Sequence, residues 1–170
     1  MSISMYDQSI APLTRMLNNL AAIVAKAEAH VEAEGIDPTA ILTARLSPDM
    51  LTFMHQIRFV SDTARGAAAR LAGVERPVME DNETTFAEAL DRINRTIAYL
   101  GEFTPEQFDG ADEKTIDLQF GPDNVMAFSG KDYLLGFVMP NFYFHVSTSY
   151  AILRHNGVKI GKIDYLGAPQ

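Results

Sequence analysis

Apolar side chains recur every three or four positions along much of the chain, which is the spacing of amphipathic helices. The first such stretch runs from about Asp7 to Glu34 and stops at Gly35, because glycine commonly follows a helix end. The second follows Ser47-Pro48-Asp49, where we expect an N-cap serine with proline in the first turn, and stops at Gly73. The predicted buried positions are Ile10, Leu13, Leu17, Leu20, Val24, Ala27 and Val31 in the first helix, and Met50, Phe53, Ile57, Val60, Ala64, Ala67 and Leu71 in the second.

Two further stretches continue the helical pattern. Thr85-Phe86-Ala87-Glu88 fits a capping box, in which the hydroxyl and the later carboxylate satisfy free backbone amides at a helix start. The fourth helix is expected from about Lys131 to Asn156, interrupted by Pro140 and followed by Gly157. The apolar stripe of the third helix consists of Phe86, Leu90, Ile93, Ile97 and Leu100. Short helical turns are predicted at Asp37-Pro38 and at Thr104-Pro105.

Between the third and fourth helices the hydrophobic period changes to two. Ile116, Leu118 and Phe120 alternate with polar residues, and the alternation resumes after the turn-forming segment 121–124. The sequence therefore predicts an all-α fold, a four-helix bundle with a small β-hairpin between helices three and four, as one domain over residues 1–170. The connection that carries the hairpin is long enough to cross the bundle, so helices three and four need not be antiparallel neighbours.

Composition narrows the class of protein. The net charge is −8 and the basic residues are scattered singly, which argues against nucleic-acid partners and against binding to a membrane surface. No apolar run approaches the roughly 20 residues needed to span a bilayer. The start of the chain has neither a basic segment nor an apolar signal core, so we expect a cytoplasmic protein. The absence of cysteine excludes disulfides and any thiol nucleophile from the chain itself.

The predicted core face of the fourth helix contains polar residues among apolar ones. Its stripe comprises Leu134, Val138, Asn141, His145, Thr148 and Ile152, flanked by Phe137, Phe142, Phe144 and Val146. A buried polar group without a partner costs about 1–3 kcal/mol, so these polar groups should have partners. His145, with Asn141 and Thr148 nearby, is either a ligand-binding imidazole in a bundle pocket or a neutral core histidine bonded to another buried group. Pro140 directly precedes them and would leave the carbonyl of Gly136 without its helical hydrogen bond.

On the second helix, His55 is the residue of greatest chemical interest. On the helical count it projects away from the core stripe, beside Leu51, Phe59 and Asp62. A side chain that projects away from the core would not share a metal ion with His145 on the fourth helix, so the helical count favours a histidine at the surface or at a subunit contact. Asp62 is either its hydrogen-bond partner or a solvated acid.

A second face of the fourth helix suggests self-association. Tyrosine, methionine and arginine are enriched at protein interfaces. Together with apolar residues predicted to point outward on helix two, these side chains predict a homodimer through helices two and four. The residues concerned are Met139, Tyr143, Tyr150 and Arg154 on helix four, and Leu51 and Phe59 on helix two.

Several stretches resemble a bacterial domain-of-unknown-function family, the one numbered nineteen ninety-three, within the DinB-like bundles. They are SISMYDQSIAPLTRML, RLSPDM, DTARGAAARLAG, TTFAEALDRI and NFYFHVSTSYAILRHNG. The resemblance implies a DinB-like four-helix bundle. Many DinB-like proteins hold a divalent ion with three histidines, one on helix two and an H-x-x-x-H pair on helix four. In that pattern His145 matches the second histidine of the pair, Asn141 stands at the first, and His55 is the candidate on helix two.

Two functions follow from the residues and the resemblance. The first is a dimeric small-molecule-binding protein whose metal site is degraded, because the amide of Asn141 is a poor ligand for transition metals. The alternative is a metal-dependent transferase or isomerase with a thiol cosubstrate, holding zinc, nickel or iron at His145 and His55. Any thiol chemistry would have to come from the cosubstrate.

Overall fold

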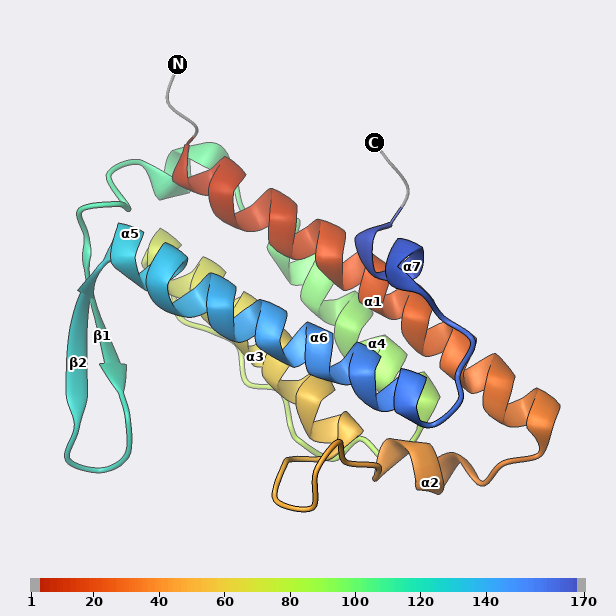
Figure 1. The fold of residues 1–170 in the computed structure, drawn as a ribbon. Coiled ribbons are helices and arrows are strands. Elements are labelled where there is room, and N and C mark those ends of the chain that lie inside the picture. Colours follow the sequence, from red (N-terminus) through yellow and green to blue (C-terminus); the bar gives the residue numbers. More distant parts are fainter. Residues whose placement is uncertain (1–3, 168–170) are drawn as a thin grey trace.

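The computed structural model describes residues 4–167, so positions 1–3 and 168–170 of the predicted domain lie outside it. Four long helices form a bundle (Figure 1), and a two-stranded antiparallel sheet lies between the third and fourth of them, as predicted. The long helices are α1 (Met5–Glu34), α3 (Phe53–Ala72), α4 (Phe86–Leu100) and α6 (Met139–His155). The shorter elements are α2 (Pro38–Leu42), the 3-10 turn η1 (Pro105–Phe108), β1 (Thr115–Gln119), β2 (Val125–Ser129), α5 (Gly130–Asp132), the π-helical turn η2 (Tyr133–Val138) and α7 (Lys162–Leu166).

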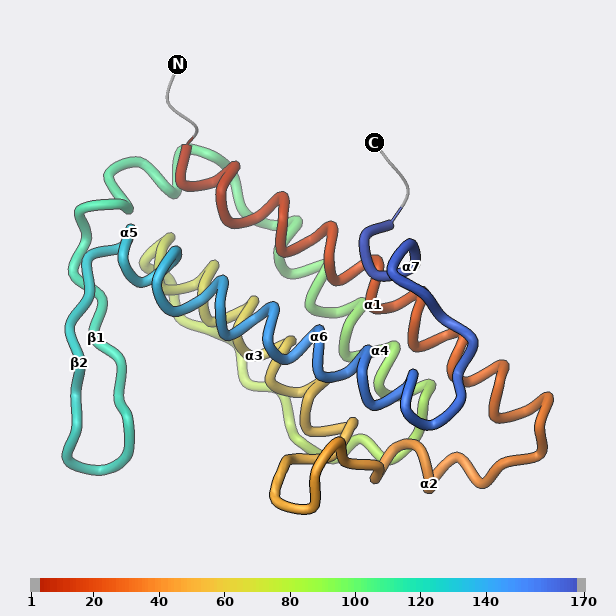
Figure 2. The backbone as a smooth tube through the Cα atoms, viewed as in Figure 1, coloured from red at the N-terminus to blue at the C-terminus, as the bar shows by residue number. Residues whose placement is uncertain are grey.

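Helix α3 packs against both α4 and α6, and α1 packs against α4. Tracing the chain in Figure 2 shows that α3 and α4 run in the same direction, opposite to α1 and α6. The chain from the end of α3 to the start of α4, residues 74–85, must therefore return along the length of the bundle. This connection makes the crossing, whereas the hairpin connection joins elements at one end of the molecule (Figure 2).

Local capping signals account for most helix ends. Gly35 and Gly73 adopt left-handed φ angles of 64° and 75° after α1 and α3, which explains why glycine stands there. The capping box of Thr85 and Glu88 opens α4, and Asp37 caps α2. All of the predicted core positions of α1 are buried, and so are those of α3 from Phe53 onward.

The predicted start of the second long helix is wrong. Helix α3 begins at Phe53 with Thr52 as its N-cap, not after Ser47-Pro48-Asp49. The earlier segment forms a turn in which the amide of Met50 donates to the carbonyl of Ser47, and the side chain of Arg45 donates to the carbonyl of Met50. These two hydrogen bonds occupy the amide and the carbonyl of Met50 in a turn instead of in the first turn of a helix. Met50 itself is half-buried and precedes the helix.

The predicted fourth helix is divided into α5, η2 and α6. Pro140 is the second residue of α6, and Val138 before that helix already has α-helical dihedral angles, so the missing N–H leaves a gap within a continuous helical segment. The helix is not simply interrupted at the proline. The six residues directly before α6 form the wider π-helical turn η2. Such widening is a common response to proline and to functional constraints within a helix. It brings Tyr133, which the regular helical count did not place in the core, to 1% exposure.

The hairpin lies at the α5 end of the bundle (Figure 1). Strand β1 pairs with β2 from Thr115 opposite Ser129 to Gln119 opposite Val125, around the predicted turn. Ile116 and Leu118 point into the core. Across residues 4–167, none of the helices combines the length and the apolar character that crossing a membrane would require.

Candidate functional site

His145 lies in the bundle interior, as predicted, with 9% of its surface exposed. Its Nδ1 is 2.7 Å from Oε1 of Gln56 on α3. The ring stacks on Phe59 of the same helix, with centroids 4.9 Å apart and 15° between the planes. Phe144 approaches the imidazole edge-on at 5.1 Å. Helices α3 and α6 together therefore fix both the position and the plane of the ring.

The hydrogen bonds of Gln56 determine which nitrogen of His145 carries the proton. The amide nitrogen of Gln56 donates to the carbonyl of Leu51 at 3.2 Å, so its oxygen must face the imidazole. An amide oxygen only accepts, and Nδ1 is consequently the protonated nitrogen. Burial lowers the pKa of His145 below its ordinary value, which favours the neutral ring near pH 7. Nε2 then keeps a free lone pair.

A cleft of about 430 Å³ opens beside this imidazole, between α3, α6, η2 and the hairpin; we call it the His145 cleft. Nε2 has no hydrogen-bond partner among residues 4–167, and it is not one of the fully buried atoms left unpaired there. It therefore retains access to the cleft. The lining residues are Leu51, Phe59, Asp62, Thr63, Arg70, Arg76, Leu118, Gln119, Phe120, Tyr133, Phe137, Asn141 and His145.

The other predicted site residues differ in how they relate to this cleft. Asn141 lines it and donates from Nδ2 to Oγ1 of Thr63 at 2.9 Å. Thr148 does not line it, and its hydroxyl donates to the carbonyl of Phe144 within the same helix. His55 does not line it either: its Nδ1 is 2.7 Å from Oγ1 of Thr52, the N-cap of α3.

The donor set around His145 does not fit a divalent metal ion. Within residues 4–167, no three side chains of histidine, cysteine, aspartate or glutamate come close enough to hold one. A protein site for zinc normally supplies at least three such ligands. The neighbours of His145 are an amide, at Gln56, and two aromatic rings. No chemistry through an ion is therefore derived for this site.

The far wall of the cleft carries a cation that the sequence did not reveal as functional. Arg70 donates from Nη1 to the hydroxyl of Tyr133 at 3.2 Å, and its guanidinium lies 6.0 Å from the centre of that ring. No carboxylate among residues 4–167 pairs with it. Nearby, Arg76 approaches Asp62 at 3.6 Å.

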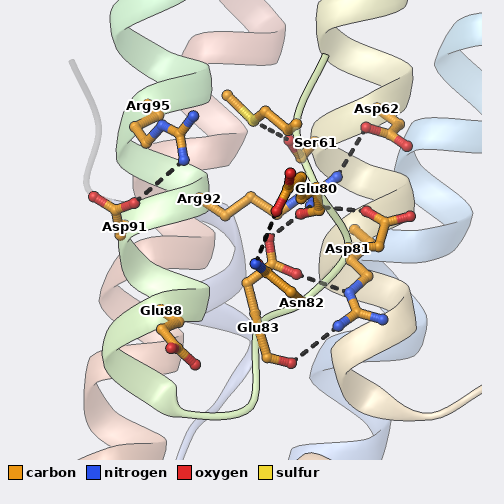
Figure 3. Close-up of polar contacts among 12 residues, drawn as sticks. Ser61, Asp62, Glu80, Asp81, Asn82, Glu83, Glu88, Asp91, Arg92 and Arg95 are labelled. Carbon is orange, nitrogen blue, oxygen red and sulfur yellow. Dashed lines mark hydrogen bonds and ion pairs between the residues drawn. The ribbon is translucent and has the colours of Figure 1, made fainter.

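Behind this wall, Asp62 is neither solvated alone nor bonded to His55, which corrects both sequence interpretations. It pairs with Arg65 and, at 3.0 Å, with Arg92 of α4. Arg92 also contacts Glu83 at 2.6 Å, and Arg58 contacts the same carboxylate at 2.8 Å. We call these five residues the arginine network; Figure 3 shows Arg92 reaching from α4 into it.

The arginine network fastens the connection between α3 and α4. Arg65 donates to the carbonyl of Pro77, Arg92 to that of Glu80, and Arg58 to that of Glu83. Arg65 and Arg92 are each 1% exposed, and only their Nε atoms lack a partner. Burial raises the pKa of Glu83, but hydrogen bonds from Arg92 and Arg58 outweigh that effect and hold the pKa below its ordinary value.

Part of the predicted dimer surface on α6 is covered by the C-terminal segment of the same chain. Tyr150 packs edge-on against Tyr165 of α7 at 5.9 Å, and Tyr143 lines a second cleft beside Tyr165. Leu51 and Phe59 point outward, as predicted, with 41% and 40% exposure, and they line the His145 cleft. The C-terminal segment thus accounts for the two tyrosines of α6, and the homodimer remains a prediction.

Comparison with known proteins gives a family and similar solved structures. The family described as Domain of unknown function (DUF1993) matches residues 5–166. A crystal structure of a DinB family member protein from Shewanella denitrificans is 38% identical to this chain, with a TM-score of 0.90. The match covers 97% of this chain and 93% of that chain. No curated protein matches.

Proposed function

This chain belongs to the DUF1993 family and shares the fold of a DinB family protein, and on that premise we propose that it binds a small molecule in the His145 cleft. The Nε2 atom of His145 would accept a hydrogen bond from the ligand. The observation that carries the proposal is the chain of hydrogen bonds from His145 through Gln56 to Leu51, which leaves that lone pair without a partner among residues 4–167.

The size and lining of the cleft support a small organic ligand. Sites for such molecules typically enclose about 300–1,000 Å³, with mostly apolar walls and a few placed polar groups. Here Phe59, Phe120 and Phe137 supply apolar wall, and His145 and Asn141 supply polar atoms. A hydroxyl, amide or thiol on the ligand would donate a hydrogen bond to Nε2. Water could also donate to Nε2, but only an organic ligand would remove the aromatic walls from contact with water.

A neutral imidazole with one fixed N–H can also remove a proton from what it binds. This is the arrangement of a general base, in which the second nitrogen is oriented by a hydrogen bond. The cleft would therefore allow proton transfer from a bound donor to Nε2. Binding is the proposed function, and proton transfer is a chemical capacity of the same atom.

The test uses N-phenyl-1-naphthylamine, a neutral aromatic amine whose fluorescence rises in apolar sites. The chain contains no tryptophan, so protein emission does not interfere. We expect saturable binding of one probe per chain. In the NMR spectrum, which contains four histidines, the ring signals of His145 should move and those of His30 and His155 should not.

A variant pair ties the result to the cleft. Phe59→Ala removes the ring that stacks on His145 and should weaken probe binding, while Phe103→Ala removes an aromatic ring that packs elsewhere, on Tyr99 and Phe108. Equal weakening by both variants, or saturation of the probe with unmoved His145 signals, would contradict the proposal.

A further inference from the structure

Arg70 presents an uncompensated positive charge to the His145 cleft. The protein as a whole carries a net charge of −8, and its other cleft-lining arginine, Arg76, approaches the carboxylate of Asp62. Arg70 instead bonds the phenol of Tyr133, a neutral group whose pKa is raised by burial. A guanidinium has several N–H donors in a fork that matches carboxylates, sulfonates and phosphates.

The guanidinium of Arg70, an exposed residue at the wall of the cleft, contacts Gly66 on one side and Tyr133 on the other. It folds back over Gly66, where a Cβ atom would stand only 2.6 Å from Nη1. Tyr133 is 1% exposed and offers its ring and hydroxyl from the other side. The absence of a side chain at position 66 therefore makes room for the cation at the wall.

Among residues 4–167, Asp62 is the carboxylate that lines the cleft, and it does not cancel the charge of Arg70. Asp62 is already shared by Arg65 and Arg92 within the arginine network, and Arg76 lies 3.6 Å from it. A second positive group thus stands beside a carboxylate that is already paired. The electrostatic character of this end of the cleft is cationic.

The remainder of the cleft is aromatic and reaches His145 at its other end. Phe120 lies edge-on to Phe137 at 5.6 Å and is 38% exposed, and Phe59 is 40% exposed. The guanidinium lies level with Gly66, about two helical turns along α3 from Phe59, or roughly 10 Å. A ligand that contacts both ends must be about that long.

We infer that the ligand of the His145 cleft is an amphipathic organic anion, about the length of two fused or linked rings. Its charged group pairs with Arg70, its apolar body lies on Phe59, Phe120 and Phe137, and its far end meets Nε2 of His145. The inference rests on the proposed small-molecule function and adds the chemical class of the ligand.

The test compares 8-anilinonaphthalene-1-sulfonate with N-phenyl-1-naphthylamine, which is the same skeleton without the sulfonate. We expect the anionic probe to bind about tenfold more tightly, as one charge-assisted contact provides. Arg70→Gln should remove that advantage and leave the neutral probe unaffected. Arg95→Gln is the matched control, because Arg95 is exposed on α4 and pairs with Asp91 outside the cleft.

A second variant moves the charge without removing it. Gly66→Ala should displace the guanidinium of Arg70 and weaken the sulfonate probe, while the helix itself keeps its fold, as circular dichroism would show. Equal affinity of the two probes for the natural protein, or an unchanged sulfonate affinity in Arg70→Gln, would overturn the inference. If the neutral probe still shifts the signals of His145 in that case, the proposed small-molecule site stands and only the anionic class fails.

Discussion

The arginine network and the His145 cleft are two polar regions along α3. The polar atoms of the network are paired within the protein, whereas key polar atoms of the cleft are not. In the network, the carboxylates of Asp62 and Glu83 each accept from two arginines, and the same arginines bond backbone carbonyls of the 74–85 connection. In the cleft, Nε2 of His145 has no hydrogen-bond partner and Arg70 has no paired carboxylate within the described residues 4–167. Polar groups that are paired within the protein hold chain segments together, and polar groups without such partners are available to a ligand.

The difference follows from what each region must do for the fold. The connection between parallel helices α3 and α4 crosses the bundle in irregular form, so its carbonyls need donors that no helix or sheet supplies. Arginine meets this need because it combines several donors with a charge that a buried carboxylate can neutralise. In the other region, the helices α3 and α6 pack directly against each other. Nε2 of His145 and the guanidinium of Arg70 are not needed to hold these two helices together.

The strongest test of this contrast removes Arg92. The Arg92→Met variant leaves Glu83, whose side chain is 10% exposed, with one cation fewer and frees the carbonyl of Glu80. Breaking a buried pair in this way typically costs about 3–5 kcal/mol. We expect a loss of that size in the free energy of unfolding, measured by urea denaturation.

Arg95→Met is the matched control on the same helix. Its partner, Asp91, is 66% exposed, and an exposed pair contributes only about 0–1 kcal/mol. If the two arginine variants unfold at the same urea concentration, the network does not hold the connection as described.

A smaller effect is expected from removing the acceptor of His145. Gln56→Leu leaves the buried Nδ1 proton without a partner, at a cost of about 1–3 kcal/mol in the free energy of unfolding. It should also release the tautomer, so that ¹⁵N spectra of the imidazole show Nε2 protonation in place of a single Nδ1–H form. Gln56→Glu, which keeps an acceptor, should preserve the Nδ1 proton and raise the pKa of His145. An unchanged tautomer in Gln56→Leu would show that Gln56 does not set it.

The smallest effect concerns pH. Burial lowers the pKa of His145 in the folded state, so below the ordinary histidine pKa of roughly 6.5 the unfolded chain binds more protons than the folded one. The contribution to stability is therefore complete above that pH and is lost as the pH falls toward the folded-state value. Urea unfolding between about pH 7 and pH 5 should show a shallower decline for His145→Gln than for the natural protein. Parallel declines would mean that the imidazole is not buried in its neutral form.

Regular elements with local signals were predictable from the sequence. The helices of α1 and α4, their glycine and capping-box ends, the hairpin and the interior position of His145 all follow from residue spacing. The start of α3 was misplaced because Ser47-Pro48 and Thr52 are both acceptable N-caps, and only the tertiary turn around Arg45 distinguishes them.

The rest of the site depends on contacts between distant segments. Arg65 and Arg92 have the sequence appearance of solvated charges, and their burial results from a connection whose path the sequence does not specify. Asn141 and His145 were found because polar residues interrupt an apolar stripe. Arg70 lacked such a signal, since a charge near the end of a helix is ordinary, and its partner Tyr133 is placed by the widened turn η2.

That turn also sets how the two ends of one continuous segment are aligned. A π-turn accommodates one residue more than a regular α-turn, so deleting one residue between 134 and 138 would restore regular α-geometry and leave the segments on both sides in register. The contact of Tyr133 with Arg70 and the position of His145 would then both be preserved. Aligning relatives of this chain by position alone, with no allowance for that surplus residue, would pair the wrong side chains on the upstream side of the turn.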